Sequence, residues 1–557
     1  MKRLLILAFL FAGLTEFLHA QSLQVGFNPL EEYHRVQQLI GKGDSSISYT
    51  VRPLSLRSFK NSFYPDTAEY SKRGRFVEAY WENKKQQEKS LLLPIVWQQQ
   101  YNSHHPYGWN DNSMAPAAGY QTLISGGFYS EFKNISIQIR PEVVIAQNKW
   151  FEGMPIDHHD EVWRKYYNHY NFIDLPEKLN SKSYVRFMPG QSAIRYHFNN
   201  FSSGISSENL WWGPGVRNSL LMSNTAPGFV HFTFNTDAPV HTRIGSFEGQ
   251  LVIGRLDESG STPPHPERAY LGTPLYVPKP DDWRYFSGLV LTYQPKWVKG
   301  LFLGTTRSMQ LYSKDLGNSI GDYLPLFGPI ERRSPAERKR EELSSIFMRW
   351  AMPEAMGEIY FEYGRNQHNT DLTDVFQRPE YSRAYLMGFK KLVPLKRRTD
   401  EYLQLHLELT QMQQQQAEIV RAGGSWYLNE HVRHGYTQLG EVIGAGVGPG
   451  ANLQSFEISW LKGLKHIGLQ LERYTHNNDL YFYTFENTKD FRTYWVDLSA
   501  AVDGTWNYKN FLFNAKLSTI RSLNYTWWLR QTDPAVYFVN GRDRTNFHAQ
   551  VGMMYRF

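Results

Sequence analysis

The chain has 557 residues, which is long for a single globular domain, and its formal net charge of +7 is modest for that length. It contains no cysteine, which excludes disulfides, a thiolate nucleophile and a thiolate metal site. Aromatic residues make up 15% of the chain, a proportion that suits aromatic belts at two membrane interfaces. The charge permits attraction to acidic polymers, but we predict no nucleic-acid partner.

The first residues have the pattern of a secretory signal peptide. Lys2 and Arg3 precede an apolar run from Leu4 to Leu14, and Ala20 is a small residue suited to cleavage. We therefore predict a signal peptide over residues 1–20. No later run of about 18 apolar residues occurs, so no transmembrane helix is predicted. An exported chain of this kind is soluble in the periplasm, soluble outside the cell or a barrel in the outer membrane.

A short helix is predicted soon after the cleavage site. Asn28 can cap it, Pro29 suits its first position, and Glu31 can reach back to the cap. We predict that residues 21–90 form a small N-terminal periplasmic region that contains this helix.

From residue 91 onward, apolar and polar residues alternate in segments of about ten residues. Between Glu401 and Thr410, leucines occupy every second position, while Gln404, His406 and Glu408 lie on the other face. A β-sandwich would have shorter strands and a more apolar interior. We therefore predict an all-β fold, a closed antiparallel transmembrane β-barrel over residues 91–557, with room for 16 to 18 strands.

The C-terminal segment favours the same fold. Phe547, Val551 and Phe557 share one face, and Asn546 and His548 share the other. An apolar face that ends in an aromatic residue is typical of the last strand of an outer-membrane barrel, although an ordinary terminal strand can have this pattern too. The strands are interrupted by long loops, and we expect some of them to fold into the lumen. These loops cover residues 99–121, 150–182, 257–285, 313–345 and 422–454.

The most distinctive stretch runs from Asn209 to Pro227. Trp211 and Trp212 precede a Gly-Pro-Gly turn, and Arg217 and Asn218 follow it. Indole faces can cover the apolar face of a sugar ring, and Arg and Asn can bind hydroxyl or carboxylate groups. The alternative is that the tryptophans pack in the protein or anchor it at an interface.

Signals for other chemistry are weak. The run His158–Glu161 is the only cluster that suggests a metal, but adjacent positions seldom give the ligand spacing of a closed site, and a solvated loop is the alternative. No Gly-x-Ser-x-Gly elbow occurs. We predict no metal, no cofactor and no enzymatic activity. Glu358, Glu362 and Arg365 are predicted to face the lumen, where they form a salt-bridge network, close the pore or bind sugar.

Several blocks resemble the Wzi family of capsule assembly proteins. The match includes the Trp-Trp-Gly-Pro-Gly block, Tyr166–Pro176, Glu358–Arg365 and His434–Thr437, in the family's order and spacing. The resemblance implies an outer-membrane barrel of 18 strands that binds capsular polysaccharide as a lectin, without catalysis.

We therefore expect a non-enzymatic lectin in the outer membrane that binds capsular or exopolysaccharide and helps its assembly on the cell surface. The expected partners are capsular polysaccharide and outer-membrane lipid, with the polysaccharide export machinery as a further candidate. A porin-like channel for sugars or small solutes is the alternative, and an outer-membrane hydrolase is a third. The candidate sugar-binding residues are Trp211, Trp212, Arg217, Asn218, Tyr166, Tyr167, His169 and His434.

Overall fold

The computed structural model describes residues 21–26, 28–59, 80–83, 88–318, 320–324, 339–366, 376–395, 400–414, 424–485, 493–528 and 542–557. The predicted signal peptide lies outside the described residues. None of the described helices is both long and apolar enough to cross a membrane.

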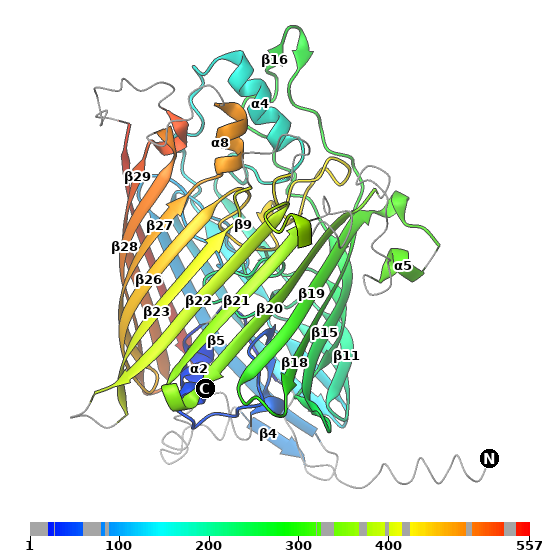
Figure 1. Ribbon diagram of the computed structural model, residues 1–557, viewed down its shortest axis with the longest axis vertical. Helices are drawn as coiled ribbons and strands as arrows, with labels where there is room; N and C mark the ends of the chain where they lie inside the picture. Colours follow the sequence, from blue (N-terminus) through cyan, green and yellow to red (C-terminus); the bar gives the residue numbers. More distant parts are fainter. Residues whose placement is uncertain are drawn as a thin grey trace.

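One large antiparallel sheet dominates the structure (Figure 1). Its strands are β4 (Tyr80–Asn83), β5 (Glu88–Asn102), β6 (Gly119–Phe132), β7 (Ile135–Ile139), β8 (Glu142–Ala146), β9 (Tyr184–Met188), β10 (Ala193–Phe198), β11 (Phe201–Ser206), β13 (His231–Thr236), β14 (Val240–His241), β15 (Gly245–Leu256), β18 (Arg284–Pro295), β19 (Leu301–Tyr312), β20 (Glu341–Met352), β21 (Gly357–Asn366), β22 (Arg383–Pro394), β23 (Glu401–Gln411), β26 (Asn452–Lys462), β27 (Lys465–Thr475), β28 (Val496–Tyr508), β29 (Phe511–Leu523) and β30 (Arg544–Tyr555).

The sheet closes into a barrel. Consecutive strands pair antiparallel, and the last strand, β30, pairs with β5, with His548 opposite Asn102 and Tyr555 opposite Ile95. The strands β7 and β8 together form one wall segment, as do β9 and β10, and β4 and β14 are short additions. The 22 strands of the sheet therefore form a wall of 18 segments. This confirms the predicted fold.

Side chains alternate between the two faces of the wall. In β23, Leu407 is exposed on the outer face, while Gln404, His406 and Glu408 are buried in the lumen. In β30, Phe547 faces outward and His548 faces inward. An outer band of apolar side chains and a polar interior are what a barrel in a lipid bilayer requires, because water is absent on the outside.

The two ends of the barrel differ. At one end the strands are joined by short turns such as Gly463–Leu464, and the C-terminus lies there (Figure 1). At the other end are the long connections, which carry α4 (Asp160–Tyr170), α5 (Ile320–Tyr323) and α8 (Asn478–Thr484). In outer-membrane barrels the short turns face the periplasm and the long loops face outward, so we name the ends inner and outer accordingly.

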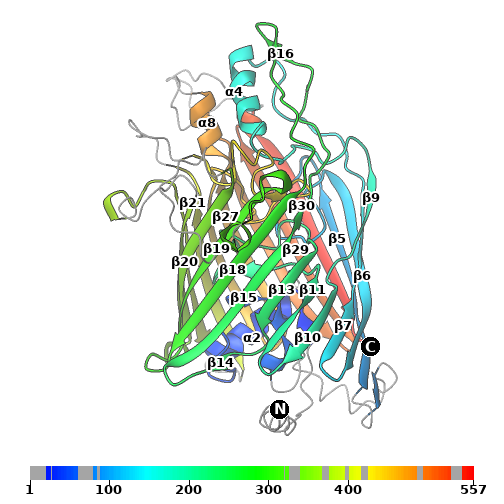
Figure 2. The ribbon, with the colours of Figure 1, turned by 90° about the vertical axis from the view of Figure 1, so that its right-hand side faces the viewer.

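The N-terminal segment lies inside the barrel at the inner end. The predicted helix is present as α2 (Asn28–Leu39), and both views place it within the lower lumen (Figure 2). Arg35 on α2 forms a 2.9 Å ion pair with Glu358, which also binds Arg349 of the wall at 2.5 Å. All three side chains are buried, so the predicted salt-bridge network exists at Glu358 and connects α2 to the wall.

Two outer connections also fold into the lumen. The one from β23 to β26 includes a predicted long loop, residues 422–454, whereas the one from β11 to β13 was not among the predicted long loops. The connection from β11 to β13 carries β12 (Trp211–Trp212), which pairs with β2 (Val51–Arg52) of the N-terminal segment. The connection from β23 to β26 supplies Trp426 and Tyr427 to the same buried apolar cluster as Trp212. The lumen is thus filled from both ends, and the two fillings meet at β2 and β12.

The remaining short elements are β1 (Ser22–Leu23), β3 (Leu54–Ser55), β16 (Ala269–Tyr270), β17 (Thr273–Pro274), β24 (Thr437–Gln438), β25 (Glu441–Val442), and the 3-10 turns η1 (Leu56–Ser58), η3 (Ser313–Asp315), η4 (Pro353–Ala355) and η6 (Tyr525–Trp527).

Candidate functional site

A pocket of about 290 Å³ lies among the outer connections, and we call it the outer pocket. It is built from five connections: those after β5, β8, β23, β27 and β29. Its aromatic lining residues are Tyr107, Trp109, Phe151, Tyr166, Tyr170, Tyr474, Trp495, Tyr525 and Trp527. Several of these rings hold one another in place, since Trp495 stacks on His476 with ring centroids 3.6 Å apart and meets Trp527 edge-on.

The outer pocket contains carboxyl groups as well as aromatic rings. The described residues that line it include two acidic residues, Glu177 and Glu441, but no Lys or Arg. The Tyr166 hydroxyl donates to the Glu177 carboxylate. Burial raises the pKa of Glu177 and raises that of Glu441 to about 8. The pocket therefore offers aromatic ring faces and carboxyl groups without a cation. This combination suits a ligand that has apolar faces and hydroxyl groups.

The helix α4 brings two of the predicted residues, Tyr166 and His169, to this pocket. The Nε2 atom of His169 accepts a hydrogen bond of 3.0 Å from the side-chain amide of Asn477. The amide orientation is fixed because its oxygen accepts from the backbone N–H of Leu480. Burial lowers the pKa of His169 to about 4, so the imidazole is neutral at pH 7. Tyr167 points away and donates to the carbonyl of His265 at 2.6 Å.

Trp211 and Trp212 lie outside the outer pocket, in the filled lumen. Trp212 is fully buried, and its indole N–H donates to Gln250 at 2.8 Å. Trp211 is also buried, and the guanidinium of Arg52 lies over its ring at 4.9 Å. In this position the two indoles support the Gly-Pro-Gly turn, which was the packing alternative considered for them.

Arg217 and Asn218 are held by a carboxylate of the wall. The backbone N–H groups of Val216, Arg217 and Asn218 all donate to Glu408, at 2.8 to 2.9 Å. The Arg217 side chain binds Glu472 at 2.7 Å and lies over the Trp109 ring at 5.3 Å. Asn218 is fully buried. A ligand in the outer pocket is therefore separated from Arg217 by Trp109.

His434, the last predicted residue, is buried beside β19. Its Nδ1 lies 2.9 Å from the hydroxyl of Tyr312, and its Nε2 lies 3.1 Å from the carboxylate of Glu258. Burial lowers the pKa of His434 to about 3, so it is a neutral donor to Glu258 at pH 7. It is not among the residues that line the outer pocket.

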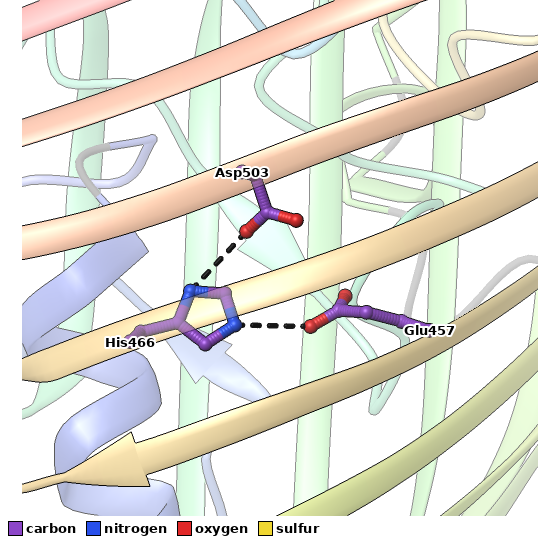
Figure 3. A group of neighbouring side chains, drawn as sticks. All are labelled: Glu457, His466 and Asp503. Atoms are coloured by element: carbon purple, nitrogen blue, oxygen red, sulfur yellow. Dashed lines mark hydrogen bonds and ion pairs between the residues drawn. The ribbon is translucent and has the colours of Figure 1, made fainter.

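A second cavity, of about 220 Å³, lies between α2 and the inner part of the wall, and we call it the inner chamber. Its lining is charged: Glu32, Arg217, Lys390, Glu457, Lys465, His466, Asp503 and Lys516. In Figure 3, His466 lies between Glu457 and Asp503, with each ring nitrogen 3.2 Å from one carboxylate. This trio is the only metal-type cluster among the described residues. Both ring nitrogens of His466 therefore already have a carboxylate partner.

The metal cluster suggested by the run His158–Glu161 does not assemble. Asp160 pairs with Arg268 and Glu161 with Arg164, so the two carboxylates have separate cationic partners. The solvated loop considered as the alternative is wrong too, because His158 is buried and Asp160 and Glu161 form the first turn of α4.

Sequence reasoning missed most of the outer pocket. Trp109, Trp495 and Trp527 come from connections far apart in the sequence. Trp109 lies in the loop predicted over residues 99–121, and that loop was the only available signal. No spacing links the other two.

The fold and the cavities define a class of protein: a plugged β-barrel of the outer-membrane type, with an aromatic pocket at its outer face. The sequence profile of capsule assembly protein Wzi matches residues 118–519, which is more than half of the chain. The chain therefore belongs to the capsule assembly protein Wzi family, as the resemblance of its motifs indicated.

One solved structure supports the fold. The structure of Wzi from Escherichia coli, described as a carbohydrate-binding β-barrel of the outer membrane involved in group 1 capsule assembly, is similar with a TM-score of 0.60 and 12% identity, over 97% of this chain and 99% of that chain. Acinetobacter baumannii OccAB2 is a more distant match (TM-score 0.39, 9% identity, 84% of this chain and 98% of that one). Pseudomonas aeruginosa OccK2 is similarly distant (TM-score 0.40, 8% identity, 84% and 97%). No curated protein sequence matches the chain.

Proposed function

We propose that the protein is a non-enzymatic lectin that binds surface polysaccharide at the outer pocket and helps the polymer assemble on the cell. The observation that carries the proposal is the aromatic pocket at the end of the barrel that bears the long loops. Ring faces cover the apolar faces of sugars, and carboxyl groups accept from sugar hydroxyls. Family membership and the carbohydrate binding of the Escherichia coli barrel support it.

The proposal assigns roles to the predicted residues. Tyr166 and His169 line the binding pocket, whereas Trp211, Trp212 and Asn218 support the turn beneath it. Outer-membrane lipid surrounds the apolar band of the wall. The polysaccharide export machinery, reached from the inner end, remains a candidate partner.

The test is capsule retention in a strain that lacks the gene, scored as cell-bound against released polymer. We expect the deletion strain to make polymer but release it, and the wild-type gene to restore retention. A gene carrying Tyr170→Ala, a partly buried pocket residue, should not restore it. Unchanged retention in the deletion strain would contradict the proposal.

Two further measurements separate the alternatives. A wide, stable conductance in a planar bilayer would favour the porin-like channel. The segments that fill the lumen predict little conductance instead. Shortened polymer after incubation with the purified protein would favour a hydrolase.

A further inference from the structure

A second hollow lies at the outer rim, next to the outer pocket. This rim cleft has a volume of about 790 Å³ and is formed by residues 150–157, 177–181 and 260–265 together with Trp528. Trp150 lies in it with 80% of its surface exposed. Phe151, Met154 and Glu177 line both the cleft and the outer pocket, so the two hollows share a wall.

The two hollows differ in size and accessibility. The outer pocket is near the lower end of the range for ligand sites, roughly 300 to 1,000 Å³, and it is surrounded by packed rings. The rim cleft is larger and carries an indole that faces solvent. A long polymer can lie in the cleft, whereas the pocket has room only for a small part of it.

Charge restricts what can enter the pocket. A sugar acid would bring a carboxylate into a pocket with no Lys or Arg among its described lining residues to compensate for the lost hydration. The cleft is less restrictive, because Lys178 and His265 line it alongside Glu152 and Asp157. An uncharged unit therefore fits the pocket, and charged units are tolerated outside it.

We propose that the outer pocket receives one uncharged sugar unit of the polymer, while the neighbouring units lie along the rim cleft over Trp150. This rests on the proposed function, because it assumes that polysaccharide is bound at the outer face. It adds the class of sugar recognised and assigns different parts of the polymer to the outer pocket and the rim cleft.

The experiment measures binding to the full chain in detergent by calorimetry. The probes are purified capsule polymer and the neutral and acidic oligosaccharide pools obtained from it by partial hydrolysis and anion exchange. The variants are Trp150→Ala in the cleft and Tyr170→Ala in the pocket. The matched control is Trp297→Ala, an indole 71% exposed near a short turn at the opposite end.

We expect the neutral pool to bind and the acidic pool to bind at least tenfold more weakly. Trp150→Ala should weaken polymer binding about tenfold and change neutral-pool binding less than twofold. Tyr170→Ala should weaken both about tenfold, and Trp297→Ala neither. Should Tyr170→Ala fail to fold, Glu177→Gln keeps the shape of the side chain, and it should weaken neutral-pool binding several-fold.

Two outcomes would overturn the inference while leaving the proposed function intact. One is an acidic pool that binds as tightly as the neutral pool. The other is polymer binding that Trp150→Ala leaves unchanged. If the wild-type protein binds neither polymer nor pools, the proposed function itself fails.

Discussion

The outer pocket and the inner chamber lie on either side of one stacked pair, Trp109 and Arg217, yet they have opposite chemistry. The outer pocket is lined by rings, and the inner chamber is lined by charges. The inner chamber takes much of its lining from strands that must face lipid with one side, so polar residues collect on the other. The outer connections are free of that alternation and can gather aromatic residues. The outer loops therefore set the ligand chemistry, while the wall and the segments inside the lumen close the barrel.

The largest effect is expected where the N-terminal segment with α2, which we call the inner plug, contacts the wall. Glu358→Ala leaves Arg35 and Arg349 buried without their shared carboxylate, and breaking such a pair costs about 3 to 5 kcal/mol. We expect a lower unfolding temperature in heat-modifiability gels and faster proteolysis of residues 21–59. The control is Asp400→Asn, which breaks the exposed pair with Lys42 and should leave the unfolding temperature nearly unchanged.

This variant also tests the separation of the two regions. If the inner plug only closes the barrel, the folded fraction of Glu358→Ala should bind polymer as the wild type does. Loss of binding in that fraction would show that the two regions are coupled.

Trp212→Ala is the next test, and it addresses one of the two indoles predicted to contact sugar. Because Trp212 is fully buried among Leu220, Leu221 and Phe286, we expect a loss of about 3 kcal/mol in stability. Polymer affinity of the folded protein should change little. A variant with wild-type stability but weakened polymer binding would show that Trp212 contacts the sugar.

The difference between these residues marks what the sequence could reveal. Alternation between Glu401 and Thr410 predicted a strand and its two faces, because a strand has a fixed period. The motif at Trp211 was visible too, but its burial was not, since that depends on β2 from a segment about 160 residues earlier. His169 could be predicted as a site residue from its stretch of sequence. Trp495 and Trp527 could not, because only the folded chain brings them to the outer pocket beside His169.

A smaller effect on stability is expected at the Trp109–Arg217 pair, which separates the two cavities. Glu408→Gln keeps the size of the side chain but removes the charge that accepts from three backbone N–H groups, a loss of about 2 kcal/mol. The turn at Val216–Asn218 should loosen, and Arg217 should leave Trp109. We expect small, flickering conductance in a planar bilayer. The control is Glu457→Gln, which changes the inner chamber without touching the turn, and equal conductance in both variants would contradict the role of Glu408.

The smallest effect concerns pH at the outer pocket. His169 has its pKa lowered from about 6.5 to about 4 by burial, so the folded protein prefers the neutral imidazole. Its contribution to stability is complete above pH 6.5 and is lost as the pH falls from 6.5 towards 4. Protonation also places an N–H of His169 opposite the amide N–H of Asn477, which breaks their hydrogen bond. Hydrogen exchange of α4, corrected for intrinsic rates, should therefore accelerate over this range in the wild type. His169→Gln cannot titrate and should remove that part of the pH dependence, and an identical pH profile in both proteins would show that His169 does not sense pH.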